Sequence, residues 1–185
     1  MLQSNFYKKK FDLKTFFIIQ RKMTPQKEFA DLFERMYELC NQNNWGDPFS
    51  YARSREIHLA NTLNHKISDT LSGADAIDED GECEYKTTVG KNISATYNGI
   101  SVKSTWDEQL KYLEEQKICK YKNHYFARYE GSKIVEVYKM DCSKVIEGLL
   151  PNLKIQFHKE KKGADPRLGY TLNKNYIINN SIKII

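Results

Sequence analysis

The sequence has no long apolar run and few of the residues that build disulfide- or metal-stabilised scaffolds. No apolar stretch is long enough to span a bilayer, which excludes a membrane-spanning protein and argues against a membrane partner. The chain has 4 cysteines, no two in a C-x-x-C pair, and its 4 histidines complete no zinc-binding pattern with them. Free thiols are typical of a reducing compartment, so we expect a cytoplasmic protein.

Motifs of several enzyme classes are also missing. Gly90-Lys91 lacks the upstream glycine of a phosphate-binding loop, and neither G-x-S-x-G nor H-E-x-x-H occurs. An excess of charge is missing too, because 29 basic residues stand against 24 acidic ones for a net charge of +5. This mildly basic balance permits an anionic partner such as nucleic acid but does not require one.

The chain does have enough apolar material for a core. It contains 185 residues, of which 40% are hydrophobic, with 12 Tyr and 9 Phe. This length suits one domain, which we place at residues 23–185. Residues 1–22 are basic around the apolar patch 16–19, which is too short for a signal-peptide core. We expect residues 1–22 to be a loosely structured N-terminal arm or an upstream extension.

Hydrophobic periodicity and turn residues predict a mixed order of helices and strands. Asn98-Gly99 breaks one expected strand, Ser50 is positioned to cap a helix, and Pro151 is expected to stop another. This order is typical of a single α/β (α+β) domain. The expected helices cover residues 26–41, 51–65, 106–115 and 142–150, and the expected strands cover 74–78, 82–89, 92–103, 124–129 and 133–140.

The most informative stretch is the predicted hairpin of residues 74–89. If its turn centres on Glu79-Asp80, Asp75 lies opposite Glu84 with Cβ atoms about 5 Å apart, and Lys86 shares the face of Glu84. Two carboxylates this close repel each other unless a cation lies between them, and carboxylate oxygens suit Mg²⁺. The plainer alternative is an exposed acidic hairpin with a Glu–Lys pair.

The expected helix 51–65 adds a further acid. Glu56 lies on one stripe with Ala60 and Leu63, where a charged residue is unexpected, so it is a candidate extra ligand or base for the same site. The alternative is an ion pair with Arg53. The polar residues around Glu56 suit phosphate or base contacts, or else form a solvated face; they are Arg53, Arg55, His58, Asn61 and His65.

Basic residues also gather near the C-terminus. Six lie between Lys154 and Lys174, in a stretch with Gly163 and Gly169 that reads as a loop able to follow a DNA backbone. The alternative is a solvated loop. The candidate DNA contacts here are Lys159, Lys161, Lys162, Arg167, Asn173 and Lys174, with Lys103 and Arg128 from the expected sheet.

The run Glu56…His65…Gly73-Ala74-Asp75…Glu84-Tyr85-Lys86 resembles the PD-(D/E)xK nucleases, specifically small type II restriction endonucleases. Ala74 stands where the motif's name has Pro, which many members lack. Asp78 is a rival for the first aspartate, but it falls in the expected turn. The resemblance covers residues 56–86 only.

The resemblance implies a restriction-endonuclease-like central mixed β-sheet of four or five strands flanked by helices. It implies that Asp75, Glu84 and the Tyr85 carbonyl bind Mg²⁺, for which Mn²⁺ can substitute. Lys86 is then the catalytic lysine and Glu56 the helix acid. The implied activity is hydrolysis of double-stranded DNA at a short specific site, leaving 5′-phosphate and 3′-hydroxyl ends. The implied partners are a second copy in a homodimer and a DNA methyltransferase of the same system that is not stably bound.

Two other functions remain open from the sequence. A repair or junction-resolving nuclease of the same fold would read DNA structure rather than sequence. A nucleic-acid-binding module without catalysis would use the acidic hairpin only as a solvated surface, and its binding would be indifferent to Asp75→Ala.

Overall fold

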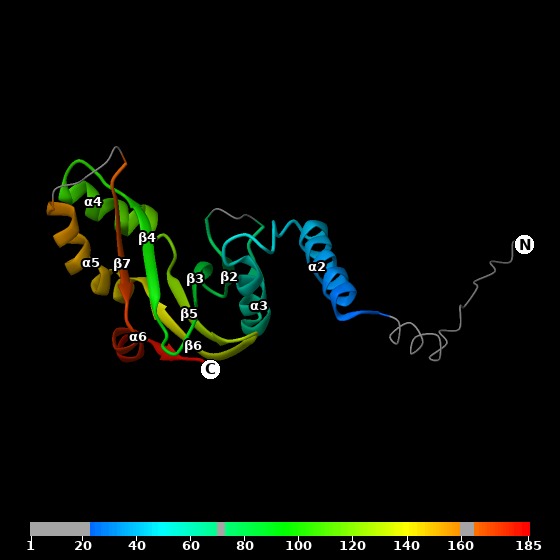
Figure 1. Cartoon of the computed structure of the whole chain (residues 1–185). Coiled ribbons are helices and arrows are strands. Elements are labelled where there is room, and N and C mark those ends of the chain that lie inside the picture. Colours follow the sequence, from blue (N-terminus) through cyan, green and yellow to red (C-terminus); the bar gives the residue numbers. More distant parts are fainter. Residues whose placement is uncertain (1–22, 70–72, 160–164) are drawn as a thin grey trace, which may run out of the picture. The chain divides into compact units, whose positions relative to one another are not determined.

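A computed structural model describes residues 23–69, 73–159 and 165–185 (Figure 1). These residues divide into two compact units, with the division between Leu39 and Cys40. The division falls inside helix α2 (Pro25–Gln42), and the expected N-terminal arm of residues 1–22 lies outside the described residues. Helix α2 repeats apolar residues every three to four positions and exposes Phe29 and Leu32. The site lies in the second unit. In the described ranges, no helix is both long and apolar enough to cross a bilayer.

The second unit contains a six-stranded sheet. Strands β3 (Gly81–Val89) and β5 (Asn123–Glu130) pair in parallel, and every other neighbouring pair in this sheet is antiparallel. The expected α/β class with a mixed sheet is therefore confirmed. The strand order is β1-β2-β3-β5-β6-β8, with β1 at Lys66–Ile67, β2 at Ala76–Asp78, β6 at Lys133–Asp141 and β8 at Ile182–Lys183.

The connection from β3 to β5 is a long crossover, as a parallel pair requires. It contains strand β4 (Ala95–Ser101), helix α4 (Trp106–Tyr112) and the π-helical turn η1 (Leu113–Lys117). Strand β4 pairs with β7 (Arg167–Leu172) in a separate antiparallel sheet. A capping box begins α4, in which the side chain of Thr105 accepts from the Glu108 amide.

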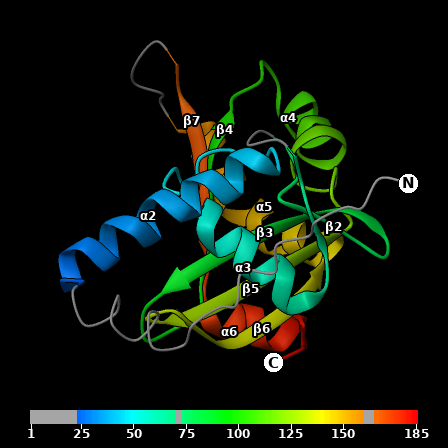
Figure 2. The same cartoon turned by 90° about the vertical axis from the view of Figure 1, so that its right-hand side faces the viewer.

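Both faces of the main sheet are covered by apolar side chains. On one face, Leu59 of helix α3 (Arg53–Leu63) packs in a cluster with Tyr125 and Tyr129 of β5. On the other, Phe126 joins a cluster with helix α5 (Cys142–His158) and the β4–β7 pair. Figure 2 shows α3 in front of the sheet and α5 behind it. Strand β5 is covered on both sides, so most of its residues are buried, including the polar Asn123 and His124. Helix α6 (Lys174–Asn180) follows β7.

Three expected boundaries were wrong, the first because of a competing local hydrogen bond and the other two because of packing against other elements. The Ser50 hydroxyl donates to the Asp47 carboxylate at 2.6 Å instead of capping α3, whose N-cap is Ala52. Asn98-Gly99 does not separate two strands but forms an irregularity within β4, where Gly99 has φ of 63°. Pro151 lies inside α5, which buries apolar residues on both sides of it.

Candidate active site

The β2–β3 hairpin has the expected register. Asp78 pairs with Gly81 and Ile77 with Glu82, so the turn centres on Glu79-Asp80. Asp75 lies just before β2, where its amide donates to the Cys83 carbonyl at 3.1 Å. Its carboxylate accepts the Tyr85 amide proton at 2.7 Å. The Asp75 side chain is thereby fixed against the backbone of the strand that contains Glu84 and Lys86.

Four charged groups act on one another at this place. Burial and then the negative charges of Glu84 and Glu56 raise the pKa of Asp75 to about 7, with partial compensation by Lys86. The Lys86 ammonium donates to the Glu84 carboxylate. Burial by itself would lower the pKa of Lys86, but the charge and hydrogen bond of Glu84 outweigh it and raise that pKa. The structure therefore brings together all four residues that the motif singled out.

Glu56 approaches the site from the first turn of α3. Burial raises the pKa of its carboxyl group, against the effect of a hydrogen bond from Arg53 at 3.4 Å. The ion pair with Arg53, the alternative considered from the sequence, is therefore present. It does not remove Glu56 from the site, because Glu56 also acts electrostatically on Asp75 and Lys86.

Glu84 and Lys86 line a cleft of about 410 Å³. Their side chains are half-buried, with exposed fractions of 17% and 25%. The Lys86 ammonium also lies 5.3 Å from the ring centre of Tyr97 in β4. The crossover supplies most of the other residues that line the cleft, namely Thr96, Asn98, Tyr112, Gln116, Lys117, Ile118, Lys120 and Tyr121.

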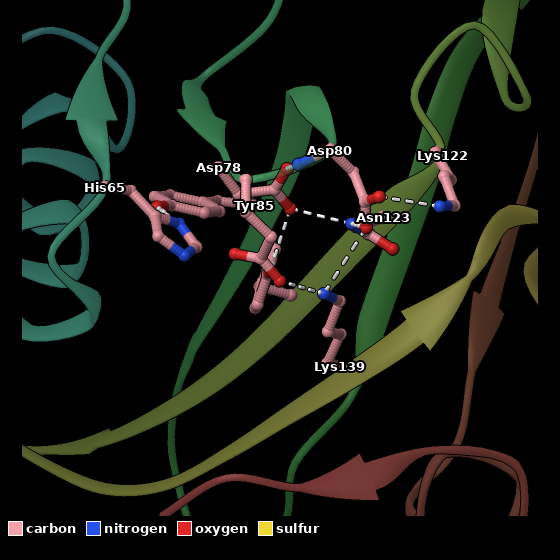
Figure 3. A network of polar contacts seen from close by, with 9 residues as sticks. His65, Asp78, Asp80, Tyr85, Lys122, Asn123 and Lys139 are labelled. Atoms are coloured by element: carbon pink, nitrogen blue, oxygen red, sulfur yellow. Dashed lines mark hydrogen bonds and ion pairs between the residues drawn. The ribbon is translucent and has the colours of Figure 1, made fainter.

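Asp78 is engaged in a different network at the hairpin tip, drawn in Figure 3. Its carboxylate accepts from the Asn123 amide and the Tyr125 hydroxyl, each at 2.8 Å, and these bonds lower its pKa despite the cost of burial. Lys122 and Lys139 form ion pairs with the neighbouring Asp80. Asp78 is thus occupied by structural contacts, which favours Asp75 as the aspartate of the motif.

The predicted DNA contacts on α3 divide into buried and exposed residues. Arg53 is buried, and its guanidinium binds the carbonyls of Trp45 and Ser68, so it is not placed to contact DNA. His65, just after α3, is half-buried; its ring lies 2.7 Å from the Tyr85 hydroxyl (Figure 3), and it lines a cleft beside α3. Arg55 binds the Thr87 hydroxyl at 2.9 Å. The remaining two, His58 and Asn61, are exposed and line the same cleft beside α3, which has a volume of about 670 Å³.

Several of the other predicted DNA contacts already have partners within the protein. Arg128 is neutralised by Glu136 and Glu130 at 2.6 and 2.7 Å, and Arg167 by Asp165 at 2.6 Å. Asn173 caps α6 by accepting the Tyr176 amide proton, so its side chain already has a structural role. Of the rest, Lys103 covers the Tyr112 ring, Lys159 and Lys174 are exposed, and Lys161 and Lys162 lie outside the described residues.

Two cleft residues were missed by the sequence reasoning. Lys117 and Lys120 are exposed and line the cleft beside Glu84 and Lys86. The signal was present, because the stretch Lys117 to Lys122 alternates lysines with apolar and aromatic residues. What the sequence did not show is the π-helical turn η1, a rare geometry that is frequent at functional sites.

The donor set at this site fits a hard divalent cation. Asp75 and Glu84 provide two carboxylates in an environment where burial and mutual repulsion raise the pKa of Asp75, so a bound cation would relieve both. In the described part of the chain, no group of three or more His, Cys, Asp or Glu side chains has the arrangement of a metal site. A cation at this site would be held by two carboxylates and water, with the Tyr85 carbonyl as a further predicted ligand.

Comparisons with known proteins do not place the chain in a family. No protein-family model matches it, and a search of curated proteins found no significant match.

Asp75→Asn should stabilise the metal-free protein at pH 8. The pKa of Asp75 is about 7 in the folded protein and near 3.8 in the unfolded chain. The stability of the fold therefore falls as pH rises from about 4 to about 7. Asparagine removes that penalty and can still accept the Tyr85 amide proton. Thermal melts in EDTA should therefore show a higher Tm for the variant at pH 8 and no gain below about pH 4.

Asp78→Asn is the matched control with the opposite sign. Its hydrogen bonds lower the pKa of Asp78, so the ionised form stabilises the fold above the ordinary pKa and the substitution should lower Tm at pH 8. If the Tm of Asp75→Asn at pH 8 is equal to or below that of the wild type, the ionised Asp75 carboxylate does not destabilise the fold, and this prediction is wrong.

Proposed function

We propose that the protein is a Mg²⁺-dependent endonuclease that hydrolyses double-stranded DNA at a short specific site, as type II restriction endonucleases do. A restriction-endonuclease-like arrangement of the mixed sheet belongs to the same proposal. The observation that supports it most is the mutual interaction of Asp75, Glu84, Glu56 and Lys86 beside an open cleft. A purely structural hairpin has no reason to gather three acids in a partly buried place, where like charges repel.

Each residue has a role that follows from its place. Asp75 and Glu84 would hold the cation, which when bound lowers the pKa of a water and offsets charge on the phosphate. Lys86 adjoins Glu84 and lines the cleft, so it can orient the attacking water and offset the charge that develops on the phosphate. Glu56 lies on the helix side, where it can orient a water bound to the site.

A nuclease that reads DNA structure is the second candidate, and the same site supports it. The two differ in products, because a site-specific enzyme cuts an intact plasmid into discrete bands. The reason to prefer the site-specific enzyme is the resemblance of residues 56–86 to the type II enzymes. A binding module without catalysis is disfavoured by the buried charges, which nucleic-acid binding alone does not require.

The proposal includes a homodimer and a cytoplasmic location. One such site cuts one strand, so a two-fold dimer on a palindromic sequence is the simplest way to cut both. A DNA methyltransferase that protects the host sequence is expected to act in the same system without stable association. Light scattering should therefore give twice the mass of one chain, and a monomer in complex with cut DNA would contradict this part.

Glu84→Ala and Lys86→Ala should both abolish most cleavage, for different reasons. Lys86→Ala leaves both carboxylates, so DNA and Mg²⁺ should still bind while single-turnover cleavage slows by about 10²-fold or more. Glu84→Ala should also weaken Mg²⁺ binding. Single-turnover cleavage with Mg²⁺ titration and a parallel mobility-shift assay measures both effects. The wild type should be inactive in EDTA and active with Mn²⁺.

Glu82→Ala is the matched control on the same strand. Glu82 is exposed and pairs with Ile77 across the hairpin, so it lies nearer the turn than Glu84 and farther from Asp75. Cleavage should fall much less than in the other two variants. If Glu82→Ala is inactive while Glu84→Ala and Lys86→Ala cut normally, the site is wrongly assigned. Undiminished wild-type cleavage in EDTA would exclude the metal-dependent mechanism.

Lys117→Ala with Lys120→Ala should weaken DNA binding and reduce its dependence on salt. Both lysines line the cleft, so they are placed to bind phosphates next to the cleaved bond. For every phosphate that the double variant no longer neutralises, the log–log salt slope should become shallower by about 0.9. Lys111→Ala is the control, because Lys111 is exposed on α4 but does not line the cleft. An unchanged slope in the double variant would remove these lysines from the DNA-binding surface.

A further inference from the structure

Tyr97 is a tyrosine in a place where the core would accept a purely apolar residue. Only 5% of its surface is exposed, and it belongs to the cluster that includes Phe126 and Leu149. A phenylalanine would fill nearly the same volume without burying a hydroxyl, and burying a polar group is costly unless it is hydrogen-bonded. One face of the ring meets the Lys86 ammonium at 5.3 Å from the ring centre, which is the geometry of a cation–π contact.

The hydroxyl of Tyr97 is hydrogen-bonded to another buried polar residue. It lies 2.8 Å from Nδ1 of His124, a residue of β5 with 1% of its surface exposed. Nε2 of His124 lies 3.1 Å from the Ile118 carbonyl, which can only accept, so Nε2 carries a proton. Burial lowers the pKa of His124 to about 4, which leaves the ring neutral and Nδ1 free to accept from the Tyr97 hydroxyl.

These bonds fix the direction of the Tyr97 ring at both ends. The backbone at Tyr97 is held by its pairing with Tyr170, and a Cβ on Gly169 would lie 3.0 Å from the Tyr97 carbonyl, so the two strands approach closely there. The hydroxyl end is fixed by His124, which lies in register with Glu84 on the neighbouring parallel strand. A buried network whose members are all satisfied holds its groups in one arrangement.

We propose that Tyr97 and His124 are positioning residues for Lys86, with the Tyr97 ring holding the ammonium at the cleft and His124 holding the ring. This rests on the proposed function, in which Lys86 acts on the phosphate. Without Tyr97, the long Lys86 side chain would be held by its acidic neighbours, chiefly Glu84, which is needed for the cation. The Tyr97 ring keeps the Lys86 ammonium in place when the Glu84 carboxylate binds the cation. The Tyr97 ring carries no net charge and its contact with Lys86 is weakly directional, so the ring does not compete with phosphate for the lysine.

The test compares Tyr97→Phe and Tyr97→Leu in the full chain. Tyr97→Leu removes the ring, so single-turnover cleavage at saturating DNA should slow by roughly 10-fold, within the range expected for a partly desolvated cation–π contact. Tyr97→Phe keeps the ring but loses its anchor, so its rate should lie between those of Tyr97→Leu and the wild type. The DNA dissociation constant should change less than twofold in both, because the effect is on placement of Lys86 rather than on binding.

Tyr138→Phe is the matched control. Tyr138 lies in the same apolar cluster with the same 5% exposure, and its hydroxyl also bonds a side chain, Glu136 at 3.2 Å. A merely structural role for Tyr97 predicts that Tyr97→Phe and Tyr138→Phe alter cleavage equally. We expect the cleavage rate of Tyr138→Phe to match the wild type, even if its Tm falls as much as that of Tyr97→Phe.

A second measurement does not depend on activity. The Lys86 ammonium lies 5.3 Å from the centre of the Tyr97 ring, so protons on the carbon next to it should be shifted upfield in the NMR spectrum of the wild type, and less in Tyr97→Phe. The shifted signal is assigned to Lys86 by its disappearance in the Lys86→Arg variant. A wild-type spectrum without the shift, or a Tyr97→Leu variant that folds and cuts at the wild-type rate, overturns the positioning role. Absence of cleavage by the wild type with the shift present overturns the proposed function instead.

Discussion

The parallel pairing of β3 with β5 determines what surrounds the candidate site. Two parallel neighbours cannot be joined by a tight turn, so the chain must leave the sheet and return to its starting end. Here the returning segment is the β4, α4 and η1 crossover, and it covers the face of β3 that bears Glu84 and Lys86. If β3 had instead been followed by a hairpin and an antiparallel strand in the place of β5, that face would lack Tyr97 and Lys117. The cleft is therefore a consequence of strand direction.

The acids of the candidate site lower the stability of the folded state. Carboxylates that repel each other in a half-buried position destabilise the folded state, and the raised pKa of Asp75 is the sign of that cost. The surrounding structure offsets it in specific ways. The Tyr85 amide donates to Asp75, Lys86 donates to Glu84, and Arg53 pairs with Glu56. Each acid has one such donor, which leaves carboxylate oxygens for a cation and water.

Local signals explain why the hairpin could be predicted from the sequence. Its register depends on a two-residue turn and on alternation with a period of two, and both are determined within residues 74–89. The pairing of Asp78 with Gly81 and of Ile77 with Glu82 follows directly. Two of the boundaries that failed depended on distant residues. The bend at Gly99 forms against β7, about 70 residues later in the chain, and α5 continues through Pro151 because both of its halves bury apolar residues.

The same distinction explains why the sequence located the clustered acids better than it located the accessible cations. A charge count does not show which cations already have an internal partner. Arg128 and Arg167 look like free basic residues in the sequence, yet each meets a carboxylate within 2.7 Å in the structure. Arg53 is buried against two carbonyls. The accessible positive charge near the cleft instead comes from Lys117 and Lys120, which η1 and the loop after it bring to Glu84.

A net charge of +5 is therefore a poor guide to where a polyanion would bind this protein. Cations that pair internally at short range contribute little to binding, because a phosphate would have to displace a carboxylate before it gained a contact. Lys120 differs, since its ammonium lies 4.0 Å from the exposed Glu82 carboxylate, a distance at which solvent weakens the pair. Under the proposed function, the residues that bind DNA should accordingly be few, and they should be those that the fold leaves exposed and weakly paired beside the acids. Affinity and chemistry would then lie at the same cleft, and base-specific contacts would come from other exposed side chains.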